Sequence, residues 1–232
     1  MVHPVLGYGI KGFIWYQGES NAPRAGEYRD LFPYLITEYR RQWKQGDFSF
    51  YWVQITSFGN SDMEAAGSAW AGLREAQTLA LRLKNTGQAV SIDLGEGKDV
   101  HPRNKHDVAM RLLRWALAND YGFKLPFRSP EYKEARIEGN RVIVTFDCFG
   151  GRLRPFGVSE AVGFAICGGD RIWHRARGRV LDENRVEVWS ESVNSPAGVR
   201  YAWADNPVCN LFNEAGLPCT PFRAALSNAL DE

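Results

Sequence analysis

The sequence of 232 residues lacks the features that would indicate a membrane or a nucleic acid as partner. No apolar run approaches the ~20 residues that a transmembrane helix needs. The formal net charge is only +1, so the charge balance gives no electrostatic case for binding nucleic acid or an anionic membrane. The first residues, Met1 to Pro4, have neither the basic nor the apolar region of a signal peptide. We therefore expect neither a nucleic acid nor a membrane as partner.

Cysteine is also scarce, with four residues and no CxxC spacing, which argues against a zinc site. We expect no metal and no cofactor. Cys209 and Cys219 flank a short loop and could form a disulfide in an oxidising compartment, but two free thiols are an equally good interpretation. No glycine-rich phosphate loop follows the first predicted strand, which disfavours a nucleotide-binding protein.

The first half of the chain alternates three times between a short strand pattern and an amphipathic helix pattern. Strands are predicted at residues 12–16, 48–56 and 88–94, and helices at 28–43, 64–84 and 104–120. This alternation predicts an α/β domain over residues 1–125, with parallel strands joined by right-handed crossovers. Three strands are few for such a domain, so we expect an amino-terminal portion that is missing or lies on another polypeptide.

The second half has a different pattern, with short strands separated by turn residues. Strands are predicted at residues 141–146, 161–166, 171–174, 179–181, 185–191 and 199–204. We therefore predict an antiparallel β module over residues 126–204, with little part in the chemistry. Residues 205–232 are expected to form a carboxyl-terminal loop and tail.

A polar cluster follows the first predicted strand directly and consists of Gln17, Gly18, Glu19, Ser20 and Asn21. Their amide and backbone donors could form an oxyanion hole or bind substrate, and the Glu19 carboxylate could brace the loop or bind substrate. Ser20 is a possible nucleophile on a strand-to-loop turn, but the closing glycine of a Gly-x-Ser-x-Gly elbow is absent. A turn or capping role is therefore favoured for Ser20.

His101 is the strongest catalytic candidate, because a neutral imidazole can take a proton from a hydroxyl and return it to a leaving group. Asp99 could fix the tautomer of His101, and Asp93 at the end of the third strand is the rival carboxylate. Gln54, at the end of the second strand, is a further possible site residue. We expect His101 and the cluster at residues 17–21 to face one cleft, because ligands bind at the carboxyl ends of parallel strands.

Four separated blocks resemble signatures of the sialate O-acetylesterase family. They are IWYQGESN at residues 14–21, REAQ at 74–77, DVHPRNK at 99–105 and YAWADNP at 201–207. The resemblance extends in order over nearly the whole chain. It implies a partial SGNH-like, flavodoxin-like parallel sheet with helices, to which a small antiparallel β module is joined.

The family resemblance also implies a function, the hydrolysis of acetyl esters on sugars by a serine and a histidine without a metal. His101 would be the general base and Asp99 its partner, and Gln17 and its neighbours would lie near the oxyanion. One residue separates Asp99 from His101, where the wider SGNH pattern has two. The family's serine lies in an upstream Gly-Gln-Ser-Asn block, so we expect an amino-terminal segment or a second chain to supply it. A periplasmic or secreted location is expected.

Two alternatives remain open at this point. The chain could resemble an acetyl xylan esterase that uses Ser20 as nucleophile. It could instead be a non-catalytic remnant that binds glycans or has a structural role. The sequence leaves open which sugar and which acetyl position are involved, and whether the substrate is a sialic acid or a plant glycan.

Overall fold

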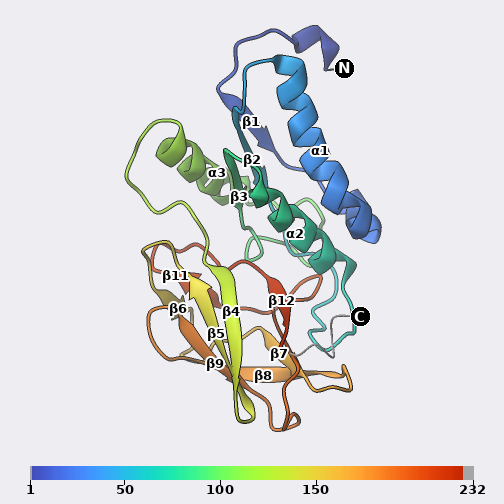
Figure 1. The fold of residues 1–232 in the computed structure, drawn as a ribbon, viewed down its shortest axis with the longest axis vertical. Coiled ribbons are helices and arrows are strands. Elements are labelled where there is room, and N and C mark those ends of the chain that lie inside the picture. The colour runs from blue at the N-terminus through green and yellow to red at the C-terminus, as the bar shows by residue number, and fades with distance from the viewer. Residues whose placement is uncertain (1, 227–232) are drawn as a thin grey trace.

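The computed structural model describes residues 2–226, which form an α/β region and an antiparallel β region placed end to end (Figure 1). The α/β region contains three parallel strands in the order β1-β2-β3. The strands are β1 (Gly12–Trp15), β2 (Ser49–Val53) and β3 (Thr86–Ala89), and the helices are α1 (Ala25–Trp43), α2 (Ala69–Leu79) and α3 (Lys105–Asn119). Short 3-10 helices occur at η1 (His3–Val5), η2 (Glu19–Arg24) and η3 (Ala80–Arg82). This order confirms the predicted alternation.

The central strand β2 is buried along its whole length, because helices cover both faces of the sheet around it. Phe50 and Trp52 point to the face covered by α1 and α2, and Tyr51 and Val53 point to the face covered by α3. Such a strand reads as one continuous apolar run, which is why the sequence predicts it well. A Cβ atom at Gly87 would lie 2.3 Å from the Trp115 ring, so only glycine lets α3 pack this closely.

Two elements in the α/β region differ most from the prediction at their ends, for local reasons. The helix predicted over residues 64–84 begins at Ala69, because the hydroxyl of Ser68 accepts a hydrogen bond from the amide of Ala71 at 2.9 Å. The strand predicted over 88–94 spans Thr86–Ala89 and is followed by a turn, in which the amide of Leu94 donates to the Ser91 carbonyl. The loop after β3 is therefore longer than expected.

The antiparallel β region contains a seven-stranded sheet in the order β12-β10-β7-β8-β9-β5-β4 and a two-stranded ribbon, β11-β6. Its strands are β4 (Glu131–Glu138), β5 (Arg141–Asp147), β6 (Leu153–Pro155), β7 (Phe164–Cys167), β8 (Trp173–Val180), β9 (Arg185–Trp189), β10 (Gly198–Tyr201), β11 (Leu211–Asn213) and β12 (Phe222–Ala225). The core of this region is apolar and includes Val142, Val144, Phe164, Val186 and Val188. The predicted antiparallel architecture is confirmed.

Residues 205–226 differ from the expected loop and tail, because they contribute β11 and β12 to the β region; residues 227–232 lie outside the described part. The two short strands predicted at 171–174 and 179–181 form a single strand, β8. The four cysteines are free, Cys209 and Cys219 included. Within residues 2–226, no helix combines the length and apolar character needed to cross a membrane.

Candidate functional site

The loops that follow the three parallel strands meet at the carboxyl edge of the sheet. The amide of Gly59, after β2, donates to the carbonyl of Gly97, after β3, at 3.0 Å. The ammonium group of Lys105, at the start of α3, lies 5.0 Å from the ring centroid of Tyr16, directly after β1. The segment after β1 therefore lies against the start of α3, which immediately follows the loop that carries Asp99 and His101. This edge is where open α/β sheets bind ligands.

The loop after β1 is held by a network centred on Gln17. The Gln17 amide donates to the Asn21 side-chain oxygen at 2.7 Å, and the Tyr28 hydroxyl donates to the other end of Gln17 at 3.2 Å. Gly18 has a φ of +153°, and a Cβ there would lie 3.0 Å from Ile55. Gln17 is thus occupied within the protein, whereas the side-chain NH₂ of Asn21 makes no hydrogen bond to any residue in 2–226 and stays available as a donor.

Glu19 and Ser20 begin the 3-10 helix η2. Ser20 is exposed, and its hydroxyl makes no hydrogen bond to another described residue. Glu19 is half-buried, and its charge acts on the phenols of Tyr16 and Tyr28. Burial raises the pKa of Tyr28 to about 12, and the charge of Glu19 adds to that shift. Because the Ser20 hydroxyl has no hydrogen-bond partner among residues 2–226, no base activates it in this arrangement.

The loop that carries His101 is shaped by carboxylates that accept hydrogen bonds from the main chain. Asp99 Oδ1 accepts from the His101 amide at 2.8 Å, and Glu96 Oε1 accepts from the Arg103 amide at 2.8 Å. The His101 side chain is exposed, and its imidazole has no hydrogen-bond partner within the described part of the chain. The contact that Asp99 makes to His101 is thus to the backbone and not to the ring.

The two remaining candidates, Asp93 and Gln54, have contacts away from the imidazole. Asp93 pairs with Arg111 through two hydrogen bonds of 2.6 and 2.7 Å, which link the end of β3 to α3. Gln54 is fully buried, and its amide donates to the Thr78 hydroxyl at 3.0 Å, between β2 and α2. The structure therefore places Asp93 at the edge of the loop after β3 and Gln54 beneath the loops.

Arg74 on α2 lies beneath the loops of the candidate site and holds their main chain in place. The sequence did not predict this role for Arg74. Its guanidinium is fully buried and donates to four main-chain carbonyls, those of Ile55, Thr56, Ala204 and Asp205, at 2.8 to 3.0 Å. Burial lowers the pKa of Arg74 to about 9. The first two carbonyls follow β2 and the last two follow β10. Arg74 thus fixes the α/β region to the β region directly below the site.

Gln77, one helical turn after Arg74, joins two of the loops. Its side-chain oxygen accepts from the Ile55 amide at 2.9 Å, and its NH₂ donates to the Gln17 carbonyl at 3.3 Å. Both residues belong to the REAQ block, so the only sequence signal for them was that block, together with a polar pair on an otherwise apolar helix face.

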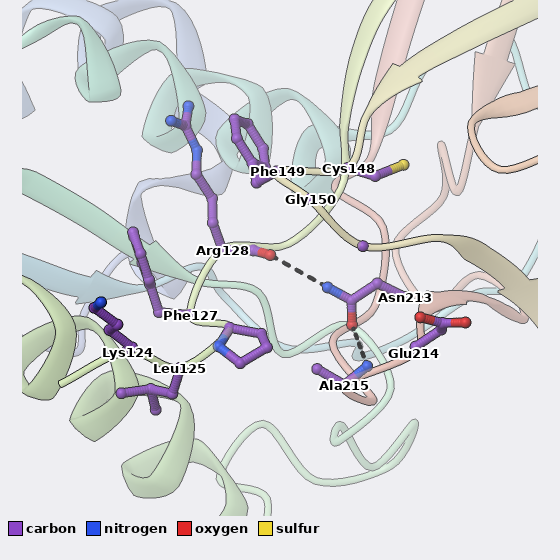
Figure 2. Close-up of a pocket in the computed structure, with 12 residues that line it drawn as sticks. Lys124, Leu125, Phe127, Arg128, Cys148, Phe149, Gly150, Asn213, Glu214 and Ala215 are labelled. Atoms are coloured by element: carbon purple, nitrogen blue, oxygen red, sulfur yellow. Dashed lines mark hydrogen bonds between the residues drawn. The ribbon is translucent and has the colours of Figure 1, made fainter.

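Two pockets lie beside the tip of the β6-β11 ribbon. The larger, of about 570 Å³, is lined by Asp93 from the loop after β3 and by Arg154, Phe156 and Glu214 from the β region. The second, of about 380 Å³, lies between residues 124–128 and the ribbon tip. Figure 2 shows Glu214 in this second pocket, on the side away from Lys124 and Phe127. No cluster of three or more His, Cys, Asp or Glu within residues 2–226 is placed to hold a metal ion.

Comparisons with known proteins identify relatives of this chain. A profile of the family described as carbohydrate esterase, sialic acid-specific acetylesterase, matches residues 3–114. The sialate O-acetylesterase of Mus musculus is 29% identical over 98% of this chain and 47% of its own length, and that of Rattus norvegicus is 32% identical over 98% and 46%. The crystal structure of a carbohydrate acetylesterase from Xanthomonas citri superposes with a TM-score of 0.91 and 40% identity, over 97% of this chain and 52% of that one.

The chain therefore spans about half the length of the relatives that it matches. The likeness to the Xanthomonas citri structure includes both the α/β region and the β region, because it covers 97% of this chain. The curated relatives align over an equally large share, and their names agree with the family profile. This chain belongs to the sialate O-acetylesterase family.

Proposed function

We propose that this chain is the histidine-bearing part of a carbohydrate O-acetylesterase, and that a preceding segment or a second chain supplies the nucleophilic serine. The observation that carries the proposal is the exposed His101 imidazole, which has no partner among the described residues and lies in the loop after β3. Membership of the esterase family supports the reaction class. An imidazole in this position can accept a proton from a hydroxyl that enters the site.

In the proposed reaction the serine oxygen attacks the carbonyl carbon of the acetyl ester while His101 takes the serine proton. The side-chain NH₂ of Asn21, with backbone donors of its loop, stabilises the negative charge on the carbonyl oxygen. The ester bond to the sugar then breaks, and His101 returns the proton to the sugar oxygen. Water then attacks the acetyl-serine while His101 takes the proton of the water; the bond between the acetyl carbon and the serine oxygen breaks, His101 returns the proton to that oxygen, and acetate leaves. Asp99 holds the turn that presents His101.

The open edge of β1 supports the need for an additional segment. β1 pairs only with β2 among the described strands, and its Ile14 side chain is 71% exposed. In parallel sheets both faces are normally covered, and the edge of the sheet is a template for a further strand. The proposal therefore includes an SGNH-type sheet in which a strand of the serine-bearing segment pairs with β1, while another part of that segment covers the face on which Ile14 lies.

The proposed substrate is an acetylated sugar, either a sialic acid or a plant glycan. The names of the relatives support this class, since they are sialate O-acetylesterases and a carbohydrate acetylesterase. We include a periplasmic or secreted location in the proposal, because such glycans are presented outside the cytoplasm. Fractionation of cells that produce the protein from its own complete gene tests this location.

Hydrolysis of p-nitrophenyl acetate tests the proposed function. We expect the 232-residue chain alone to show little activity, and the chain combined with the upstream segment that carries Gly-Gln-Ser-Asn to be active. Replacement of that upstream serine by alanine should then abolish turnover. Rapid hydrolysis by the chain alone, or unchanged activity without the upstream serine, would contradict the proposal.

A further inference from the structure

The larger pocket joins the α/β region to the β region. Asp93 belongs to the same loop as His101, whereas Arg154, Phe156 and Phe212 come from the β6-β11 ribbon and the residues after it. The Phe156 ring is 77% exposed, and its centroid lies 6.0 Å from that of Phe212. The two rings meet edge to face, with an interplanar angle of 61°, and an exposed aromatic ring presents a flat apolar surface to the solvent.

The main chain that carries this ring is held in place by Asn210. The Phe156 amide donates to the Asn210 carbonyl at 2.8 Å, and the Asn210 side-chain NH₂ donates to the carbonyls of Phe156 and Glu160 at 3.1 and 2.9 Å. Its side-chain oxygen accepts from the Val162 amide at 2.7 Å. The pocket wall is therefore fixed before any ligand binds, which lowers the entropy cost of binding.

The charged groups of the pocket are mixed in sign. Arg154 and Glu214 are exposed and make no ion pair with another described residue, while the charge of Asp93 is paired with Arg111. A guanidinium offers hydrogen-bond donors and a carboxylate offers acceptors, and a sugar hydroxyl needs both. The exposed positive charge of Arg154 and the exposed negative charge of Glu214 offset each other, so the pocket has no net attraction for a charged ligand. The pocket thus suits a ligand that is rich in hydroxyl groups and uncharged.

We propose that this pocket, lined by Asp93, Arg154, Phe156, Phe212, Asn213 and Glu214, binds an uncharged stretch of a glycan chain. A sugar ring would lie on Phe156, and its hydroxyl groups would bond to Arg154 and Glu214. The inference rests on the proposed function and extends it, because it makes the substrate an acetylated residue within a longer glycan and not a free monosaccharide. It also gives the β region a part in substrate selection.

Calorimetric titration of the 232-residue chain with xylopentaose, cellopentaose and 3′-sialyllactose tests the proposal. We expect saturable binding of a neutral pentasaccharide at concentrations up to about 10 mM. Phe156→Ala should weaken that binding about tenfold, because the stacking surface is lost. Arg154→Ala should weaken it as well. Phe123→Ala is the matched control, since Phe123 is also exposed, at 59%, but lies outside the pocket.

Three outcomes would overturn the proposal. These are no binding of either neutral pentasaccharide, equal binding by the Phe156→Ala variant, or binding of 3′-sialyllactose alone. Hydrolysis of p-nitrophenyl acetate by the assembled enzyme, which is the chain combined with the upstream serine-bearing segment, separates this proposal from the proposed function. Hydrolysis that persists although neither neutral pentasaccharide binds would refute the glycan-binding proposal only. Absent hydrolysis with intact glycan binding would refute the esterase proposal only.

Discussion

The two regions of the molecule differ in what they bury. Beneath its loops, the α/β region buries Gln54, Arg74 and Gln77 completely, and each of them bonds to main chain or to a neighbouring side chain. The β region instead buries an almost wholly apolar core around residues such as Val144 and Val188. A buried polar network costs desolvation but fixes directions, whereas an apolar core provides stability without directing any polar group. The difference indicates that position matters most around the loops of the α/β region.

A buried charge in the β region strengthens this view. Arg200 on β10 is almost fully buried, and its guanidinium donates to the carbonyls of Met63 and Ala65, which lie in the loop after β2. It also lies over the Trp173 ring, 4.2 Å from the centroid. The buried charge of the β region is thus directed at a loop of the α/β region. Arg74 and Arg200, two of the three arginines that are buried within residues 2–226, thus hold the loops of the proposed site.

If chemistry belongs to the α/β region alone, the largest effect should come from His101. We expect His101→Ala to reduce kcat for p-nitrophenyl acetate about 10⁴–10⁶-fold in the assembled enzyme, as loss of a base does in serine hydrolases. The free energy of unfolding should change by less than about 0.5 kcal/mol, because the side chain is exposed. His106→Ala, also in an exposed position, is the control. Near-normal turnover by the His101 variant would show that His101 is not the catalytic base and that the α/β region of this chain does not carry out the proton transfer.

The next largest effect should come from Arg74, where the two regions are joined. We expect Arg74→Met to lower the free energy of unfolding by about 3–5 kcal/mol, because buried carbonyls lose their donors. Arg74→Lys should be intermediate, since an ammonium group cannot reproduce the planar fork of donors. Urea unfolding measures the change, with Arg136→Ala on the exposed part of β4 as the control. A loss below about 1 kcal/mol would mean that the junction depends on other contacts.

The contrast between the two regions also explains which elements the apolar pattern of the sequence predicted and which it missed. Apolar periodicity predicted α1, α3 and the central strand β2, because their buried faces follow the 3.6-residue and continuous patterns. It missed β4, whose sequence EYKEARIE is charged because it forms a sheet edge with one exposed face. It also missed β12, which has only four residues and finds its partner, β10, more than twenty positions earlier.

The ends of the predicted strands indicated which loops form the candidate site, but they did not indicate the contacts within those loops. The cluster at residues 17–21 and the loop of His101 were found because polar residues directly follow strand patterns. The role of Arg74 was not predictable, since its partners Ala204 and Asp205 lie about 130 positions away and are main-chain carbonyls without a residue signature. The hydrogen-bond partner of Asp99 could not be predicted either, because a carboxylate two residues before a histidine can accept a hydrogen bond from the backbone amide or from the ring of that histidine.

A smaller effect is expected at Asn21, which would stabilise the transition state without taking part in proton transfer. Asn21→Ala should lower kcat about 10²–10³-fold with little change in KM, as the loss of one oxyanion donor does. Asn119→Ala, near the end of α3, is the control, because its amide bonds to the Trp115 carbonyl away from the site. An increase in KM with unchanged kcat would assign Asn21 to ground-state binding instead.

The smallest effect is expected at Ser20, and it decides whether the α/β region of this chain holds a nucleophile of its own. Ser20 is exposed in η2, and its hydroxyl has no hydrogen-bond partner in the described residues, so no base activates it. Ser20→Ala should therefore leave kcat of the assembled enzyme within about twofold, whereas loss of a true serine nucleophile costs about 10⁶-fold. A collapse of turnover in the Ser20 variant, with the upstream serine intact, would make Ser20 the nucleophile. In that case His101 would have to approach Ser20 when substrate binds, because the two side chains make no contact in this structure.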